Sequence, residues 1–393
     1  MIKKLIMVGA TTQNNKLVNG QSMMFQLFVD QLQERGIKTD IVDFGKSLNP
    51  QLHKNRVSGK FDFSKLIDNF FLIFRFVFVI LSNPKTPLYI NTSQSKVGFV
   101  RDYIFINFAK LFKRKIIVHQ FGANYTKFYN SQSLGNQLNI KNTLKKTDSI
   151  IVEGDFTKEQ FSFLPDYQSK VVSVTNGLPE KIDGHEMSPK KLISTEPVEL
   201  FYLSNLIEGK GYWDVLEAVD ILVNKDKRNV NAVFAGRFLE DAEDRRFSSS
   251  AEAREKFDTF VEQNNLQDRV KYVEGLYGAE KSKAFQKAHF FLLPTYYINE
   301  GQPVSVLEAL VYGCVPVVTP YRLIPDMVNP QNGFFVNPQS PPEIAKVISS
   351  MIDNPDDYQA RSAAGINDYK ANFTAEKYVE RVLDLINTVI AEK

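Results

Sequence analysis

The sequence predicts an α/β protein made of two doubly wound domains, each built on a parallel sheet. Short apolar runs alternate with amphipathic stretches along the whole chain, which is the pattern of βαβ units. This alternation lapses once, in the polar stretch 181–197, and then starts again. A chain of 393 residues suits two or three domains. The break at 181–197 therefore divides the chain into one domain at 1–185 and a second at 198–372.

The first domain is expected to begin with a buried strand and a helix. The helix is predicted over Ser22–Arg35, where Gly36 supplies the usual stop. The predicted strands are Lys4–Val8, Thr39–Val42, Leu88–Ile90, Lys115–Val118, Ser149–Val152 and Val171–Val174.

The second domain repeats the same pattern. Its predicted strands are Glu199–Leu203, Asn231–Ala235, Val270–Val273, Phe290–Leu293 and Val315–Val318, and its clearest helices are Tyr212–Val223 and Pro303–Tyr312. In such sheets ligands bind beyond the carboxyl ends of the strands. We therefore expect the functional residues in the loops that follow strands, at a cleft between the two domains.

Charge is distributed unevenly between the two halves of the chain. Residues 1–197 hold 27 lysines and arginines against 16 acidic residues, whereas residues 198–393 hold 21 against 29. This asymmetry indicates that the first half meets something anionic. Basic clusters at 113–115 and 141–146 could lie near anionic lipid head groups or form a solvated face. No nucleic-acid-binding motif accompanies them, so nucleic acid is not an expected partner.

Compartment and membrane topology follow from composition. The single cysteine, Cys314, excludes an intramolecular disulfide and suits a reducing compartment. The first apolar stretch is too short for a signal-peptide core. The apolar segment Phe70–Leu81 is too short to cross a bilayer. We expect a cytoplasmic protein in which this segment is a buried helix, or else one that seeks the inner face of the plasma membrane.

The loop after the predicted strand Phe290–Leu293 has the features of a phosphate site. Pro303 suits the first turn of a helix, where its missing N–H costs nothing. Gly301 lets the backbone approach a ligand closely. The free amides of Val304 and Ser305, at the positive end of the helix dipole, suit an anionic group such as a phosphate.

Two carboxylates flank this helix start. Glu300 lies on the loop before the helix, and Glu308 lies about one and a half turns inside it. A carboxylate beside a phosphate is repelled, so each is expected to accept hydrogen bonds from hydroxyls, which are of the strong charge-assisted kind. A sugar on one side of a diphosphate and a ribose on the other meet this condition.

In this context the segment resembles the retaining GT-B glycosyltransferases of family 4 (glycosyl transferases group 1), whose mark is two glutamates separated by seven residues. The resemblance implies a GT-B fold, in which two Rossmann-like domains face a central cleft. It assigns Glu308 to the ribose, Glu300 with Gly301 and Gln302 to the sugar, and the Val304 and Ser305 amides to the diphosphate.

The loop after the strand Glu199–Leu203 carries the second match. Lys210 matches the family lysine that binds the donor diphosphate, and a cation there stabilises the leaving group. Asn205 stands where the family often has an arginine, so Asn205 is a donor-binding candidate and Arg237 a candidate replacement cation.

Matches in the first domain are looser. His119, which ends a strand, corresponds to a family histidine that faces the transferred sugar. Gly20 matches a glycine loop that borders the donor phosphate. The segment 375–393 resembles the C-terminal helix that packs back on the first domain. By resemblance, then, the catalytic candidates are Glu300, His119 and Lys210.

The resemblance implies transfer of a sugar from a UDP- or GDP-sugar to a glycan or polyprenyl-diphosphate-linked acceptor, with retention, in bacterial surface polysaccharide biosynthesis (O-antigen, capsule or exopolysaccharide). No Asp-x-Asp motif follows a strand, so we expect neither a metal nor another cofactor. Peripheral contact with an anionic membrane is a further expectation.

Other functions remain open on the residues alone. A nicotinamide dehydrogenase, or an epimerase or phosphorylase acting on a related scaffold, would share the fold, although no Gly-x-Gly-x-x-Gly follows the first strand. A non-catalytic sugar-binding protein would share the predicted cleft.

Overall fold

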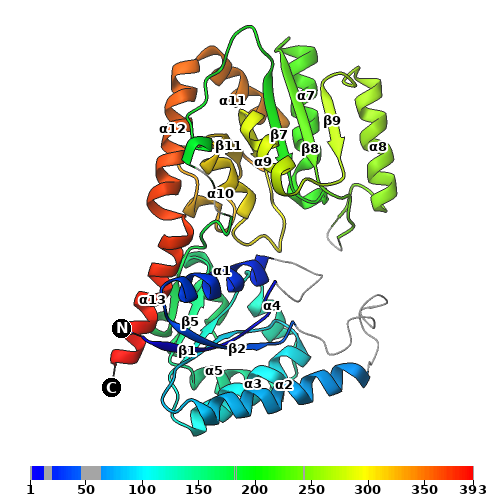
Figure 1. Cartoon of the computed structure of the whole chain (residues 1–393). Helices are drawn as coiled ribbons and strands as arrows, with labels where there is room; N and C mark the ends of the chain where they lie inside the picture. Colours follow the sequence, from blue (N-terminus) through cyan, green and yellow to red (C-terminus); the bar gives the residue numbers. More distant parts are fainter. Residues whose placement is uncertain are drawn as a thin grey trace. The chain divides into compact units, whose positions relative to one another are not determined.

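The computed structural model describes residues 2–12, 20–45, 63–180, 182, 184–241 and 244–392. The chain divides into two compact units, which Figure 1 shows in sequence colours. Unit 1 comprises Met1–Pro179 and Ala375–Lys393, and unit 2 comprises Glu180–Thr374. Each unit is a parallel sheet with helices on its faces, so the predicted fold class of two Rossmann-like domains is confirmed.

The described part of unit 1 holds a six-stranded parallel sheet in the order β2-β1-β3-β4-β5-β6. Its strands are β1 (Lys4–Gly9), β2 (Lys38–Asp43), β3 (Leu88–Asn91), β4 (Ile116–His119), β5 (Ser149–Val152) and β6 (Val171–Ser173). Most are short, fully buried apolar runs, as expected where helices cover both faces of a parallel sheet.

Two layers of helices cover this sheet. The helices of unit 1 are α1 (Gly20–Glu34), α2 (Phe63–Ser82), α3 (Lys96–Leu111), α4 (Tyr125–Asn130), α5 (Leu134–Lys145), α6 (Tyr167–Lys170) and α13 (Ala375–Ala391). Residues of α2, α3 and α5 share one core with alternate strand residues such as Ile6 and Val8. Residues of α1 and α13 share the opposite core with Leu5 and Met7 (Figure 1). The period of two along β1 therefore assigns its side chains to the two cores.

The apolar segment Phe70–Leu81 belongs to α2, and it is not wholly buried. Phe76 and Ile80 on its inner side are fully buried, whereas Phe74 on its outer side is 69 % exposed. The expectation of a helix buried all round is thus wrong on one side. No described helix combines the length and the apolarity that a membrane span needs.

The described part of unit 2 holds a second six-stranded parallel sheet, in the order β12-β11-β10-β7-β8-β9. Its strands are β7 (Val198–Leu203), β8 (Val230–Ala235), β9 (Val270–Val273), β10 (Phe290–Leu293), β11 (Val315–Val318) and β12 (Phe334–Phe335). The sequence predicted all of these strands except the two-residue β12. The central strands β7 and β10 end beside each other, so the loops that follow them share one edge of the sheet.

The helices of unit 2 fill the connections between strands. They are α7 (Tyr212–Asp220), α8 (Ser250–Gln263), α9 (Gly278–Lys287), α10 (Val304–Val311), α11 (Pro341–Asp353) and α12 (Pro355–Asn372). The predicted helix Tyr212–Val223 is α7 together with the π-helical turn η5 (Ile221–Lys225). Pro303 occupies the N-cap of α10, one residue before the first helical position.

Candidate active site

The loops that follow β7 and β10 pack directly on each other. The Tyr296 amide donates to the Gly209 carbonyl over 2.7 Å. Gly211 has a φ of +75°, and a Cβ at this position would lie 2.5 Å from the Pro294 carbonyl oxygen. Only glycine tolerates both the positive φ and the close approach of the Pro294 carbonyl at this position. The close approach fixes where Lys210, between these two glycines, meets the second loop.

Lys210 and Glu300 form a pair at this junction. The Lys210 Nζ lies 3.4 Å from Glu300 Oε1 and 3.3 Å from Oε2. Thr295, fully buried just after β10, donates to Glu300 Oε2 over 3.0 Å. The ring of Tyr297 lies 5.3 Å from the Lys210 Nζ. The carboxylate is therefore held by a hydroxyl and an ammonium at the end of the sheet, 5 % exposed.

The start of α10 lies next to Glu300 in the chain. Gln302 and Pro303 are buried, while Gly301, Val304 and Ser305 are partly exposed. An α-helix leaves its first amides without partners inside the helix. The amides of Val304 and Ser305 occupy these positions, so the positive end of the helix dipole opens beside the Lys210–Glu300 pair.

Glu308 is buried inside α10 and has its own lysine partner. The Lys281 Nζ, from α9, lies 2.5 Å from Glu308 Oε1 and 2.7 Å from Glu180 Oε1. The side chain of Glu308 is only 6 % exposed and that of Lys281 16 %. Three charged groups thus form a chain that leads from Glu180, the first residue of unit 2, to the interior of α10.

Burial sets the electrostatics of this chain. It raises the pKa of Glu308, and Lys281 only partly offsets the effect. Burial alone would lower the pKa of Lys281, but Glu308 and Glu180 outweigh it and raise that pKa. Lys281 therefore stays charged and opposes the effect of burial on the Glu308 carboxyl.

Asn205 and Arg237 lie on the neighbouring loops after β7 and β8. The Leu206 amide donates to the Arg237 carbonyl over 2.8 Å, which places the two loops side by side. Asn205 is exposed. The Arg237 side chain is 63 % exposed, and its Nε lies 3.8 Å from Glu274. Arg237 is therefore a surface cation near the same sheet edge.

His119 lies in unit 1, fully buried at the end of β4. Its Nδ1 lies 2.5 Å from the Tyr89 hydroxyl oxygen, and its ring stacks on Phe121 at 4.0 Å. Burial lowers the pKa of His119 to about 3, so the ring is neutral at physiological pH. Among the described residues, no hydrogen-bond partner faces its Nε2.

Asn91 occupies the paired position on β3, and the sequence did not mark it. It pairs in register with His119 and is fully buried. Within the described residues neither polar atom of its side chain has a hydrogen-bond partner. Unpaired buried polar groups are costly, so the ends of β3 and β4 present unmet hydrogen-bonding capacity. Gly20 starts α1, and a Cβ there would meet nothing within 4 Å, so packing does not require this glycine.

The structure adds functional candidates in unit 2 that the sequence did not single out. Thr295 is the second residue after β10, where strand-end polar residues are expected, and its position was a usable signal. Lys281 lies on a different helix from Glu308 and belongs to no motif, so only the fold reveals the pair.

The second half of the chain matches a known protein family. Residues 183–368 match the sequence profile of the family described as Glycosyl transferases group 1. This range contains Lys210, Lys281, Glu300 and Glu308. A search of curated protein sequences gives no match to the chain.

Solved structures share the whole fold at low sequence identity. A glycosyltransferase from Rickettsia africae ESF-5 matches with a TM-score of 0.69 and 15 % identity, over 99 % of this chain and 100 % of that chain. Anabaena HepE in complex with UDP matches with a TM-score of 0.65 and 12 % identity, over 98 % and 100 %. Sucrose-phosphate synthase from Thermosynechococcus elongatus matches with a TM-score of 0.65 and 16 % identity, over 99 % and 100 %.

The family profile and these neighbours together support a glycosyltransferase. The structural likeness extends over both units, while the profile match lies wholly within unit 2.

Proposed function

We propose that this protein is a retaining glycosyltransferase of family 4 that transfers a sugar from a nucleotide diphosphate to an acceptor hydroxyl. The observation that carries the proposal is the pair of buried carboxylate–lysine contacts, Glu300 with Lys210 and Glu308 with Lys281, on either side of the α10 N-terminus. Acids that flank a dipole-favoured anion site suit a diphosphate that carries a sugar on each side.

The diphosphate would lie at the start of α10. The Val304 and Ser305 amides donate to its oxygens, and Lys210 supplies a full positive charge. The Lys210–Glu300 distances of 3.3 and 3.4 Å are long for an ion pair, and an ammonium has three donors. Lys210 can therefore contact a phosphate while it still faces Glu300. Negative charge grows on the diphosphate as the glycosidic bond breaks, so these fixed donors lower the barrier.

The transferred sugar would face Glu300. Thr295 and Lys210 orient this carboxylate, and Gly301 with Gln302 brings the backbone close to the sugar. On the other side, Glu308 accepts hydrogen bonds from the ribose hydroxyls, and Lys281 beside it favours its ionised form. Asn205, on the loop after β7, and Arg237, on the loop after β8, border the diphosphate in this proposal.

His119 would meet the donor sugar or the acceptor as a neutral hydrogen-bonding group. When Tyr89 donates to Nδ1, the His119 Nε2 carries the proton and becomes a donor. Asn91 beside it offers both a donor and an acceptor. Gly20, at the start of α1, borders the donor phosphate in this proposal.

Retention would proceed without a covalent enzyme intermediate. The acceptor hydroxyl approaches on the face that the diphosphate leaves, and the departing diphosphate oxygen takes the acceptor proton. The acceptor oxygen forms the new bond to the anomeric carbon as the bond between that carbon and the diphosphate oxygen breaks. Closing the site excludes water, which would otherwise hydrolyse the donor. No metal or other cofactor takes part.

UDP- and GDP-sugars are the proposed donors. The structures of Anabaena HepE with UDP and with UDP-glucose support a uridine nucleotide. A glycan or a polyprenyl-diphosphate-linked acceptor, used in bacterial surface polysaccharide biosynthesis at the cytoplasmic face of the plasma membrane, completes the proposal.

The test is a donor screen followed by a turnover assay. Thermal shift with UDP-, GDP- and ADP-sugars identifies the donor, and nucleotide release with candidate acceptors measures transfer. The anomeric configuration of the product is read by NMR. We expect Glu300→Gln to lower turnover about 100-fold, while Glu262→Gln, at an exposed carboxylate on α8, leaves it unchanged.

The alternatives give different results in the same assays. Donor binding without transfer to any acceptor would indicate a sugar-binding protein, and sugar release to inorganic phosphate would indicate a phosphorylase. Unchanged turnover in Glu300→Gln would refute the role of this carboxylate.

A further inference from the structure

The outer side of α2 in unit 1 is an apolar surface. Its phenylalanines Phe70, Phe74 and Phe78 are 67 %, 69 % and 65 % exposed, and Leu81 is 54 % exposed. These residues recur every three or four positions, so they form one stripe along the helix. The opposite side of α2 packs into the core, so this stripe is additional to what folding needs.

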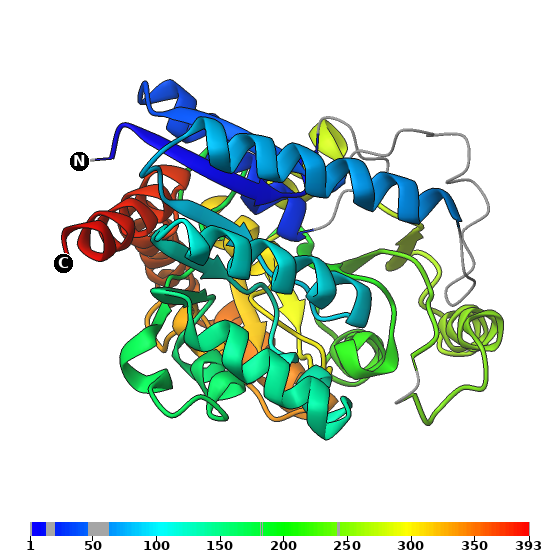
Figure 2. The ribbon, with the colours of Figure 1, turned by 90° about the horizontal axis from the view of Figure 1, so that it is seen from below.

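Helices α3 and α5 extend the same surface. Figure 2 shows α2, α3 and α5 side by side across one face of unit 1. Val97, Val100 and Leu111 form an exposed apolar stripe on α3, and Leu134 and Leu138 do the same on α5. We call the outer sides of these three helices the docking face. Monomeric soluble proteins rarely expose so many large apolar side chains on one face unless that face binds something.

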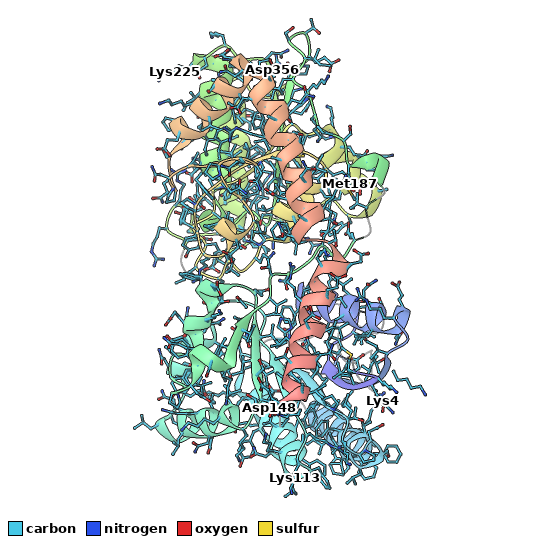
Figure 3. All side chains as sticks on the ribbon, turned by 90° about the vertical axis from the view of Figure 1, so that its left-hand side faces the viewer. Lys4, Lys113, Asp148, Met187, Lys225 and Asp356 are labelled. Carbon is cyan, nitrogen blue, oxygen red and sulfur yellow. The ribbon has the colours of Figure 1, made fainter. Side chains whose placement is uncertain are left out.

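The charge around the docking face is strongly positive. Residues 63–148 contain thirteen lysines and arginines and three acidic residues, Asp68, Asp102 and Asp148. Asp102 pairs with Arg101 over 2.6 Å, and Asp148 pairs with Lys110 and Lys115, so the other basic residues dominate the charge of this face. Lys96 and Lys113 flank α3, and Figure 3 shows Lys113 at the outer end of this layer.

A recess opens within the docking face. It encloses about 300 Å³ between α3, α4 and α5. Its lining combines Lys96 and three amide side chains of residues 132–139 with apolar side chains that include Phe99, Val100 and Ile140. A cation beside an apolar lining suits an amphiphile with an anionic head and a hydrocarbon chain.

We propose that the docking face binds the surface of an anionic lipid bilayer. Apolar side chains would enter the boundary between head groups and acyl chains, and the surrounding lysines would contact the head groups. Neither apolar insertion nor electrostatic attraction alone holds a protein firmly at a membrane, whereas the two together do. A second copy of this chain is disfavoured as the occupant, because a twofold interface would bring two strongly basic surfaces together.

Membrane binding through the docking face would determine where the protein works, and it is separate from the transfer reaction. A bilayer partner places unit 1 where a lipid-linked substrate would be presented. The docking face contains none of the residues assigned to the donor, so vesicle binding and sugar transfer can succeed or fail separately.

Flotation with vesicles tests the proposal on the full chain. We expect binding to vesicles of phosphatidylcholine with phosphatidylglycerol at low salt, weaker binding at high salt, and little binding to phosphatidylcholine alone. Neutralising Lys96 and Lys113 (Lys96→Gln with Lys113→Gln) should weaken binding about fivefold per lysine. Phe74→Ser with Phe78→Ser should weaken it by roughly tenfold or more.

Matched controls come from exposed positions of unit 2. Tyr277, 73 % exposed, and Lys225, also exposed, offer Tyr277→Ser and Lys225→Gln, which should bind vesicles like the unaltered chain. Equal thermal unfolding temperatures confirm that each variant is folded. Absence of binding to anionic vesicles at low salt would overturn the proposal. So would a dimer, measured by light scattering, that Phe74→Ser with Phe78→Ser converts to a monomer, because the face would then join two copies.

Discussion

Replacing Lys281 with methionine removes the cation that faces Glu308 while keeping most of the side-chain volume. The Lys281 Nζ lies 2.5 Å from Glu308 Oε1, and Glu308 is 6 % exposed, so no water can take over the full role of the ammonium. Burial already raises the pKa of Glu308, and losing the lysine raises it further. Glu308 in Lys281→Met would then take up a proton at a higher pH than in the unaltered chain.

The stability cost follows from the burial of the pair. Breaking a buried ion pair by removing one partner costs about 3 to 5 kcal/mol. Protonation of Glu308 limits this loss, and Glu180, whose side chain is 36 % exposed, is easily hydrated. We therefore expect Lys281→Met to lower the free energy of unfolding by about 3 kcal/mol at neutral pH. Lys281→Met with Glu308→Gln should recover most of it, because no uncompensated charge remains.

The functional result is a shifted pH dependence of nucleotide affinity. Because only the carboxylate makes charge-assisted hydrogen bonds to the ribose, Lys281→Met should lose donor affinity at a higher pH than the unaltered chain as the pH is lowered. Lys281→Arg, which keeps a cation beside Glu308, should follow the unaltered chain. Urea unfolding and calorimetric titration of the full chain measure the two effects. If Lys281→Met shows the same dependence of affinity on pH as the unaltered chain, Lys281 does not favour the ionised form of Glu308 for binding.

Three further predictions concern backbone strain and pH. Gly211→Ala should lower the free energy of unfolding by about 1 to 3 kcal/mol and displace Lys210. The reason is that a Cβ at this position, where φ is +75°, would lie 2.5 Å from the Pro294 carbonyl oxygen. Gly20→Ala, with open space around it, is the control in thermal unfolding. Burial raises the pKa of Asp214 to about 6, so above that pH the fold holds a buried carboxylate that is more stable in the unfolded chain. Asp214→Asn should therefore stabilise the fold by about 2 kcal/mol at pH 8 but not below about pH 4. Burial lowers the pKa of His119 to about 3, so stability should fall as the pH drops below 6.5, and unfolding of His119→Gln should depend less on pH over this range.

The sequence predicted the strands well because buried parallel strands are short apolar runs bounded by loops. Phe290–Leu293 and Val315–Val318 match the structure residue for residue. The two-residue β12 carries too little pattern to be recognised. The π-helical turn at Ile221–Lys225 continues the period of α7 closely enough to resemble ordinary helix.

The candidate site was predictable where its residues are close in sequence. Glu300, Pro303 and Glu308 lie on one loop and one helix, so their relation follows from helix geometry. The Lys210–Glu300 and Lys281–Glu308 contacts join residues that are 90 and 27 positions apart, and nothing local encodes them. The sequence also did not predict which side of α2 is buried. An apolar segment without an amphipathic pattern does not show which of its sides packs against the core.

The most direct test of the account is the position of a bound donor in a crystal of the full chain. We expect the diphosphate of the preferred nucleotide sugar within hydrogen-bonding distance of the Val304 and Ser305 amides and the Lys210 Nζ, with Glu308 on the ribose. A donor bound elsewhere, with the start of α10 unliganded, would contradict it.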